Sequence, residues 1–234
     1  ETNLQAEEAL KTAIRLDPDY ALPHAHLSQV YSFRAENKWV DPTGPTVDRA
    51  MEHARRAVSL DDRLPFAHFA LGRLHTRSFS PDFKIAIAEF RRAIELDPNY
   101  VDAYMFLANT YIFDGRAEEA LPLIAEGFAR NPIAPYWYHL AEGMAAYFLG
   151  DYDKAREYFE KTLATCLKTF GEEPSMVASS YNNLGELAVR RDDREVALKL
   201  LMVDTVNDPA GIERFKREAA TAARLRHPGI VPVY

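Results

Sequence analysis

The sequence contains few features of a disulfide-rich, membrane-spanning or nucleic-acid-binding protein. Its one cysteine, Cys166, permits no internal disulfide. It has no apolar run of about eighteen residues, the length that suggests a transmembrane helix, and no signal-peptide pattern. With 28 lysines and arginines against 35 aspartates and glutamates, its net charge of −7 leaves no broad basic surface for phosphate backbones. We therefore expect a cytoplasmic protein that contacts neither nucleic acid nor membrane.

Residues that would mark a catalytic or metal site are also scarce. The seven histidines show no His-Glu-x-x-His spacing, and the sequence has no Cys-x-x-Cys pair. No Gly-x-Ser-x-Gly turn surrounds a candidate nucleophile, and Cys166 has no neighbouring pattern that would activate it. The sequence therefore predicts no metal, no cofactor and no hydrolytic centre.

A short pattern recurs along the chain. Residues Arg92–Tyr100 return as Thr12–Tyr20, and more weakly as Arg56–Asp62 and Ala129–Pro132. Upstream, pairs of small residues stand seven apart, which places both on one face of a helix. These pairs are Ala6 and Ala13, Ala50 and Ala57, Ala86 and Ala93, and Ala120 and Gly127. Small side chains let a neighbouring helix approach closely, and the Asp-Pro pair then ends the helix.

This pattern resembles the tetratricopeptide repeat, a helix-turn-helix unit of about 34 residues. Val101–Ala134 fits one unit without insertion, and extra residues fall around 36–45 and 78–81. The matching residues are Tyr104, Leu107, Ala108, Tyr111, Gly115, Ala120, Gly127 and Pro132. The resemblance implies an all-α fold, a right-handed superhelical α-solenoid of about five and a half repeats over residues 1–201. Its first repeat is truncated, because residues 1–18 supply only a second helix.

The C-terminal residues carry a different signal. Val196–Lys199, Arg214–Ala219 and His227–Val231 occur in this order and resemble the amino-terminal lobe of bacterial Ser/Thr protein kinases. In that family a strand lysine holds the phosphates of ATP and pairs with a glutamate on a helix. The resemblance therefore implies Lys199 and Glu218 as a vestigial nucleotide-binding pair.

The other kinase elements are missing from the sequence. Residues 178–195 contain only Gly185 where a phosphate-binding loop needs several glycines, and no His-Arg-Asp or Asp-Phe-Gly motif follows. Without these groups nothing positions the nucleophile or the metal ions, so we expect that the chain alone is not an enzyme. Residues 194–201 fit both the repeat and the kinase strand, and we favour a helix there. A kinase-like tail over 202–234 should form a short C-terminal helical extension with an irregular end.

The tetratricopeptide resemblance also implies a binding site. Members of the family hold ligand peptides in a concave groove lined by first helices, and here those positions are mainly apolar and aromatic. The corresponding residues are Phe66, Phe69, Arg73, Arg77, Met105, Asn109, Ile112, Phe113, Trp137, Leu140, Met144, Tyr147 and Phe148. We expect a non-catalytic scaffold for a protein or peptide partner, and whether it forms homo-oligomers stays open. A chaperone-tail adaptor is disfavoured, because Ala25 and Gln29 depart from the lysine and asparagine used by such members.

Two alternatives stay open from the sequence. The chain could be a truncated or remnant Ser/Thr protein kinase region of a repeat-containing signalling protein, in which Lys199 and Glu218 still engage ATP. It could also join two unrelated pieces, because both ends look cut and the junction lies within the motif shared at residues 194–201.

Overall fold

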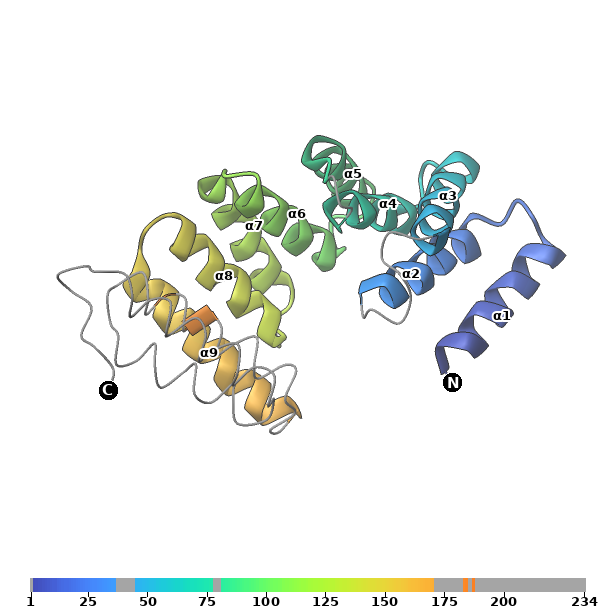
Figure 1. Cartoon of the computed structure of the whole chain (residues 1–234). Helices are drawn as coiled ribbons and strands as arrows, with labels where there is room; N and C mark the ends of the chain where they lie inside the picture. Colours follow the sequence, from blue (N-terminus) through green and yellow to red (C-terminus); the bar gives the residue numbers. More distant parts are fainter. Residues whose placement is uncertain (1, 37–44, 78–80, 171–182, 185–186, 188–234) are drawn as a thin grey trace, which may run out of the picture. The chain divides into compact units, whose positions relative to one another are not determined.

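The structure is a computed structural model that describes residues 2–36, 45–77, 81–170, 183–184 and 187. Within these ranges every regular element is an α-helix (Figure 1), which confirms the predicted all-α architecture. The helices are α1 (Thr2–Leu16), α2 (Ala21–Glu36), α3 (Pro45–Leu60), α4 (Pro65–Arg77), α5 (Phe83–Leu96), α6 (Val101–Phe113), α7 (Ala117–Arg130), α8 (Tyr136–Phe148) and α9 (Tyr152–Phe170). They belong to two compact units, residues 1–134 and 135–234.

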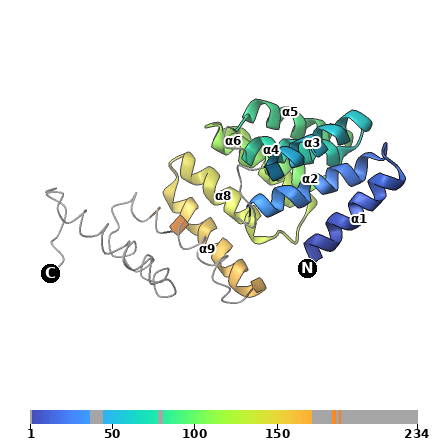
Figure 2. The ribbon, with the colours of Figure 1, turned by 45° about the vertical axis from the view of Figure 1, so that its right-hand side comes forward.

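The first unit is a stack of helix pairs (Figures 1 and 2). The first helices α2, α4 and α6 pack on the second helices α3, α5 and α7, while α1 packs on α2. Successive first helices also touch one another, whereas each second helix contacts the following first helix. The first helices are thus direct neighbours along the stack. We call the side formed by α2, α4 and α6 the inner face.

An aspartate-based turn joins each second helix to the next first helix in three places. The N–H groups of Asp17, Asp61 and Asp97 donate to carbonyls four residues earlier and close the helices. The side chain of each aspartate then accepts from the N–H two residues later, at 3.2, 3.0 and 2.9 Å. These Asx turns give the recurring Leu-Asp pattern its physical role.

Glycine ends two of the first helices. Gly115 follows α6 and Gly150 closely follows α8, with φ of +79° and +80°. Residues with a Cβ rarely adopt this conformation, so glycine is the usual residue here. After α6, the N–H of Arg116 donates to the carbonyl of Tyr111 at 2.8 Å and satisfies one of the last helix carbonyls. Each glycine thus lets the chain reverse into its second helix.

Glycines on first helices meet phenylalanines on second helices. Gly72 and Phe90 are the eighth residues of α4 and α5, and a Cβ added to Gly72 would lie 2.9 Å from the phenyl ring. Gly143 and Phe159, the eighth residues of α8 and α9, repeat this arrangement in the second unit. The missing side chain of each glycine makes room for the ring, so these helix pairs approach closely.

A buried ionic cluster fixes α1 against α2. Glu7 is 8% exposed, and its carboxylate accepts from the Tyr31 hydroxyl at 3.0 Å and pairs with Arg34 at 2.5 Å and Lys11 at 2.7 Å. Arg34 also donates to the side chain and to the carbonyl of Asn3. Burial alone would raise the pKa of Glu7, but these donors lower it to about 2. The carboxylate therefore stays charged and ties α1 to the end of α2.

The second unit is described over α8, α9 and three later residues. Ala146, Ala155 and Phe159 form a buried cluster that also includes Leu184 and Leu187. Residues from the expected last repeat therefore contribute to the core between α8 and α9.

Several predictions concern residues outside the described ranges. These are the helix over residues 194–201, the domain boundary at residue 201, the helix of the tail over 202–234, and the pair Lys199 and Glu218.

Two histidines meet between α2 and α3. The Nδ1 atoms of His24 and His53 lie 2.9 Å apart, so one ring must accept a hydrogen bond and be neutral. Burial lowers the pKa of both histidines. His68 differs: burial alone would lower its pKa, but its hydrogen bonds with Glu89 and with the Asp62 carbonyl, together with the charge of Glu89, raise it.

We expect the first unit to lose thermal stability as the pH falls from about 7.5 to about 5.5. The unfolded chain takes up protons near the ordinary histidine pKa of 6.5, whereas folded His24 and His53 resist protonation, so acid favours unfolding. Each kcal/mol lost should lower the melting temperature, followed by circular dichroism, by about 2–4 °C.

Two variants test whether His24 and His53 cause this pH dependence. His53→Gln should flatten the pH dependence, because the buried pair no longer exists. His68→Gln should steepen it, because the raised pKa of His68 stabilises the fold below its ordinary pKa. A slope that His53→Gln leaves unchanged would show that the pair is not responsible.

Candidate interaction surface

The inner face of the first unit combines polar side chains with exposed aromatic rings. The ninth residues of α2, α4 and α6 are Gln29, Arg73 and Asn109, and all three are half-buried. Phe33 and Phe113, the thirteenth residues of α2 and α6, are 45% and 58% exposed. Aromatic anchors surrounded by groups that can hydrogen-bond are typical of the residues that dominate protein binding.

Arg73 is the charged centre of this face. Its NH2 group donates to both carboxylate oxygens of Glu36, at 3.1 and 3.3 Å. Its guanidinium group lies 5.2 Å from the centre of the Phe106 ring. The packed surroundings of Asp102 raise the pKa of that carboxyl, and the nearby charge of Arg73 opposes the rise. Because carboxylates balance the guanidinium charge, this face would recognise a ligand by shape and hydrogen bonds more than by net charge.

Three residues that the sequence suggested for the groove lie in the core. Phe69, Met105 and Ile112 are 3%, 0% and 0% exposed. The Phe69 ring lies 4.9 Å from the Tyr100 ring and 5.1 Å from the Phe106 ring, centre to centre. Rings from the start of α6 and from the residue before it therefore cover Phe69. The three residues support the inner face and present no surface to a ligand.

Two further groove candidates lie on α4. Phe66 is half-buried, and its ring centre is 4.4 Å from that of His26 on α2. Arg77 is the last residue of α4, and its side chain is outside the described part of the chain. Phe66 therefore bridges the first helices of two repeats.

The groove residues predicted for the second unit all lie on α8. Trp137, Leu140, Met144 and Tyr147 are half-buried, and Phe148 is 49% exposed. Leu140, Met144 and Tyr147 pack on the core cluster between α8 and α9. Phe148 thus offers the largest exposed fraction on this helix face.

Sequence reasoning missed Gln29 and Phe33. Asn109 and Phe113 are the ninth and thirteenth residues of α6. Gln29 and Phe33 occupy the same two positions of α2, so the same rule would have selected them. In the sequence, Ala25 and Gln29 do fall at binding positions of this repeat, but they were used only to argue against a chaperone-tail adaptor.

Comparison with known proteins identifies the repeat. Tetratricopeptide repeat family models match residues 82–142 and 137–202, which together span more than half of the chain. The chain belongs to the tetratricopeptide repeat family. The second match includes residues 194–201.

Solved structures of similar fold include one described as a TPR protein. YrrB, a TPR protein with an unusual peptide-binding site, aligns with 90% of this chain and 99% of its own at 19% identity and a TM-score of 0.53. The PilF protein of Pseudomonas aeruginosa aligns over 93% of this chain and 90% of its own, with 19% identity and a TM-score of 0.62. A chain of the APC/C hetero-tetramer Cut9–Hcn1 gives a TM-score of 0.73 at 16% identity, over 93% of this chain and 39% of that one. At these identities the likeness shows the fold alone.

Short segments match bacterial protein kinases, as the sequence predicts. The Ser/Thr protein kinase PrkC of Bacillus subtilis is 55% identical over 42 residues, which is 18% of this chain and 6% of the kinase. PknB of Mycobacterium tuberculosis is 44% identical over 57 residues, 23% of this chain and 9% of the kinase. The chain thus spans less than a tenth of these relatives.

The described residues offer neither a membrane span nor a metal site. No helix in these ranges combines the length and apolar character needed to cross a bilayer. In the same part of the chain, no three histidine, cysteine, aspartate or glutamate side chains gather as a metal site would require.

Proposed function

We propose that this chain is a non-catalytic interaction module that binds a peptide segment of a partner protein on its inner face. The observation that carries the proposal is the row formed by Gln29, Arg73 and Asn109, with Phe33 and Phe113 exposed beside it. Amide and guanidinium groups can hydrogen-bond a peptide backbone, while aromatic rings cover its apolar side chains. The family and its fold support this class of function.

The spacing of the repeats suggests the register of such a ligand. Neighbouring helices pack about 8–10 Å apart, and an extended peptide advances about 3.3 Å per residue. One repeat therefore spans about three peptide residues. Phe33 and Phe113 lie two repeats apart, so we expect apolar ligand residues separated by about six positions.

Phe113→Glu should weaken binding of a selected peptide at least tenfold, because it places a charge where an apolar side chain would pack. The peptide is obtained by display selection against the unaltered chain, and its affinity is measured by fluorescence anisotropy. Leu121→Glu is the matched control, because Leu121 is 47% exposed but lies on the second helix α7. Lys199→Ala should leave peptide binding unchanged.

The opposite result would place the binding surface elsewhere on the chain. If Leu121→Glu or Lys199→Ala removed binding while Phe113→Glu kept it, the inner face would not be the binding surface. Trp137→Glu provides the same test for α8 in the second unit.

The kinase-like segment favours a second candidate function, a nucleotide-binding remnant. Its support is the sequence identity with PrkC and PknB. If this function is retained, the chain should bind a fluorescent ATP analogue, and Lys199→Ala or Glu218→Ala should abolish the signal because each removes one member of the expected pair. Analogue binding that both variants retain would exclude this pair as the site.

A further inference from the structure

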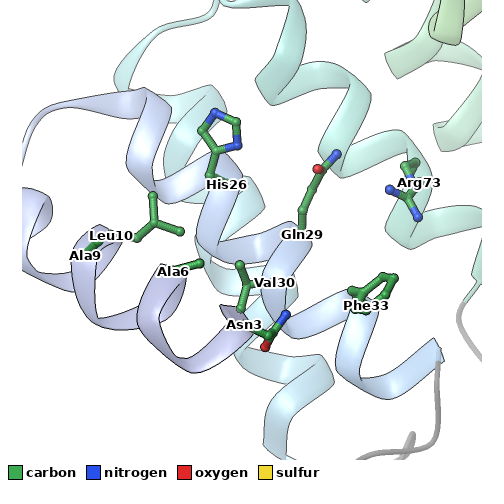
Figure 3. A pocket seen from close by; sticks show the side chains of 9 residues that line it. All are labelled: Asn3, Ala6, Ala9, Leu10, His26, Gln29, Val30, Phe33 and Arg73. Carbon is green, nitrogen blue, oxygen red and sulfur yellow. The ribbon is translucent and has the colours of Figure 1, made fainter. Parts of the chain in front are cut away.

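Two cavities of the first unit each have one arginine in their lining. One lies between α1 and α2, with Arg73 of α4 at its rim (Figure 3). The other has a volume of about 430 Å³, lies between α5 and α7 over α6, and is lined by Arg91. Arg73 pairs with Glu36 at 3.1 Å, whereas none of the described carboxylates lies within ion-pair distance of Arg91. The α5–α7 cavity is therefore the one whose arginine has no acidic partner among the described residues.

The floor of the α5–α7 cavity is formed by side chains of α6. Tyr104, Leu107 and Tyr111 line the cavity and are 8%, 2% and 2% exposed. Ile94 on α5 and Leu123 on α7 are half-buried and belong to the two walls. The cavity is open to solvent between the two helices, and its base is apolar. Such a surface suits a large apolar side chain of a bound segment.

Tyr111 holds the guanidinium group of Arg91 in place. The NH2 group of Arg91 donates to the Tyr111 hydroxyl, and the guanidinium carbon lies 5.8 Å from the centre of the Tyr111 ring. Arg116 lies over the same ring at 4.5 Å. The bond to Tyr111 uses only part of the donor capacity of Arg91, so the remaining N–H groups are available to a carboxylate of a ligand. Because the side chain is already held, binding costs less conformational entropy.

The two acidic residues of the cavity lining are each bound to an arginine outside the lining. Glu119 accepts from Nε and NH2 of Arg116 at 2.6 and 2.8 Å. Glu95 accepts from Arg92 at 3.3 Å. These pairs offset the charges of the two carboxylates, whereas no such pair offsets the charge of Arg91. The lining is therefore locally complementary to an acidic group of a ligand.

The preceding repeat provides an internal comparison. His68 and Tyr104 are the fourth residues of α4 and α6, and Glu89 and Leu123 are the seventh residues of α5 and α7. The Glu89 carboxylate lies 2.6 Å from Nδ1 of His68, so the preceding repeat supplies its own acidic group beside the floor residue. In the α5–α7 cavity Leu123 takes the place of that carboxylate, and the space remains open. A ligand that supplies the carboxylate would complete the same arrangement.

We propose that the α5–α7 cavity binds an extended segment of a partner protein in which an acidic residue and a large apolar residue stand two positions apart. The acidic side chain pairs with Arg91, and the apolar side chain covers Leu107 between Ile94 and Leu123. Side chains two positions apart point to the same side of an extended segment and are about 6.6 Å apart. Arg91 and Ile94 are separated by about 5 Å along α5, so the two spacings match. This site goes beyond the inner-face site, because it lies between second helices and recognises a carboxylate.

The direct test uses the fluorescein-labelled peptide Gly-Ser-Asp-Ser-Phe-Ser-Gly and the full chain. Fluorescence anisotropy should show saturable binding that Arg91→Gln weakens at least tenfold, because the peptide carboxylate loses its partner. Arg55→Gln is the matched control, since Arg55 is exposed at the same position of α3, and it should bind normally. Absence of saturable binding, or equal binding by the two variants, would overturn the proposal.

A change in the peptide tests the same contact from the other side. A peptide with Asn in place of Asp should bind the unaltered chain at least tenfold more weakly. Arg91→Gln should then cause no further loss, because both changes remove the same ion pair. If the two losses were additive, the carboxylate would contact some other group and the proposal would fail.

Leu123→Glu tests the comparison with the preceding repeat. It places a carboxylate in the cavity beside Arg91, so it should weaken binding of the Asp peptide at least tenfold. Leu121→Glu is the matched control, because Leu121 is 47% exposed on the same helix and is not part of the cavity lining. An equal loss in both variants would show a response to the charge of α7 and not to occupation of the cavity, which would contradict the proposal.

Competition separates this site from the inner face. An excess of the display-selected inner-face peptide should not displace the Asp peptide, so failure of one site is distinguishable from failure of the other. Displacement would place both peptides on one surface and overturn the proposal. Sedimentation of the free chain is also decisive: a dimer that Leu123→Glu dissociates would assign the cavity to a second copy and overturn the assignment to a partner protein.

Discussion

Gly143→Ala is expected to lower the unfolding free energy of the second unit by about 2 kcal/mol. The added Cβ would lie 2.5 Å from Cδ1 of Phe159, and this ring is 2% exposed, so it cannot turn aside without moving the core. Overpacking of this kind typically costs up to about 3 kcal/mol, and the higher helix propensity of alanine offsets about 1 kcal/mol of it. Urea unfolding followed by Trp137 fluorescence measures the loss, in a Trp39→Phe background because the sequence has two tryptophans.

Two controls separate the clash from a general loss of stability. Gly143→Ala combined with Phe159→Leu should recover part of the lost stability, because the smaller side chain makes room for the methyl group. Gly72→Ala should leave the Trp137 transition unchanged, because its effect falls on Phe90 in the first unit. If the Gly143→Ala variant were as stable as the unaltered chain, α8 and α9 would not be held at such close spacing.

Glu7→Gln is expected to destabilise the attachment of α1 by about 3 kcal/mol. The substitution keeps the size of the side chain but leaves Arg34 without its carboxylate partner, and the two side chains are only 10% and 14% exposed. Native-state hydrogen exchange in α1 measures the effect, since α1 should open locally before the rest of the first unit unfolds. Glu8→Gln is the matched control, because Glu8 is 69% exposed and should lose less than about 1 kcal/mol.

The pH dependence of this cluster gives an independent measure. The folded pKa of Glu7 is about 2 against an ordinary value of 4.5, so its stabilisation is complete above pH 4.5 and is lost as the pH falls toward 2. Glu7→Gln should remove this part of the acid dependence of α1 protection. If the acid dependence of α1 were the same in both proteins, the cluster would not be what fixes the helix.

Much of the fold follows from local residue chemistry. Asp97 and Gly115 act through their own backbone neighbourhood, so their turns can be predicted wherever the pattern recurs. The seven-residue spacing of Ala86 and Ala93 likewise predicts a buried face, and both are 0% exposed. Such local signals are sufficient to predict an all-α repeat fold from the sequence.

The candidate site was less predictable, because exposure depends on neighbours that are distant in sequence. Phe69 and Phe113 are both aromatic residues at groove positions, yet one is 3% and the other 58% exposed. Phe69 is covered by rings from the following repeat, which its own sequence context does not reveal. Ala6 shows the reverse case, since its pattern predicts burial but the helix that would cover it is not among the described elements.

The central claim is that a partner peptide binds on the inner face formed by α2, α4 and α6. Hydrogen–deuterium exchange of the chain with and without a display-selected peptide tests this most directly, because bound ligand protects the helices it covers. We predict slower exchange in α2, α4 and α6, centred near Gln29, Arg73 and Asn109, with little change on α3, α5 and α7. Protection confined to the second helices, or to neither layer, would contradict the account.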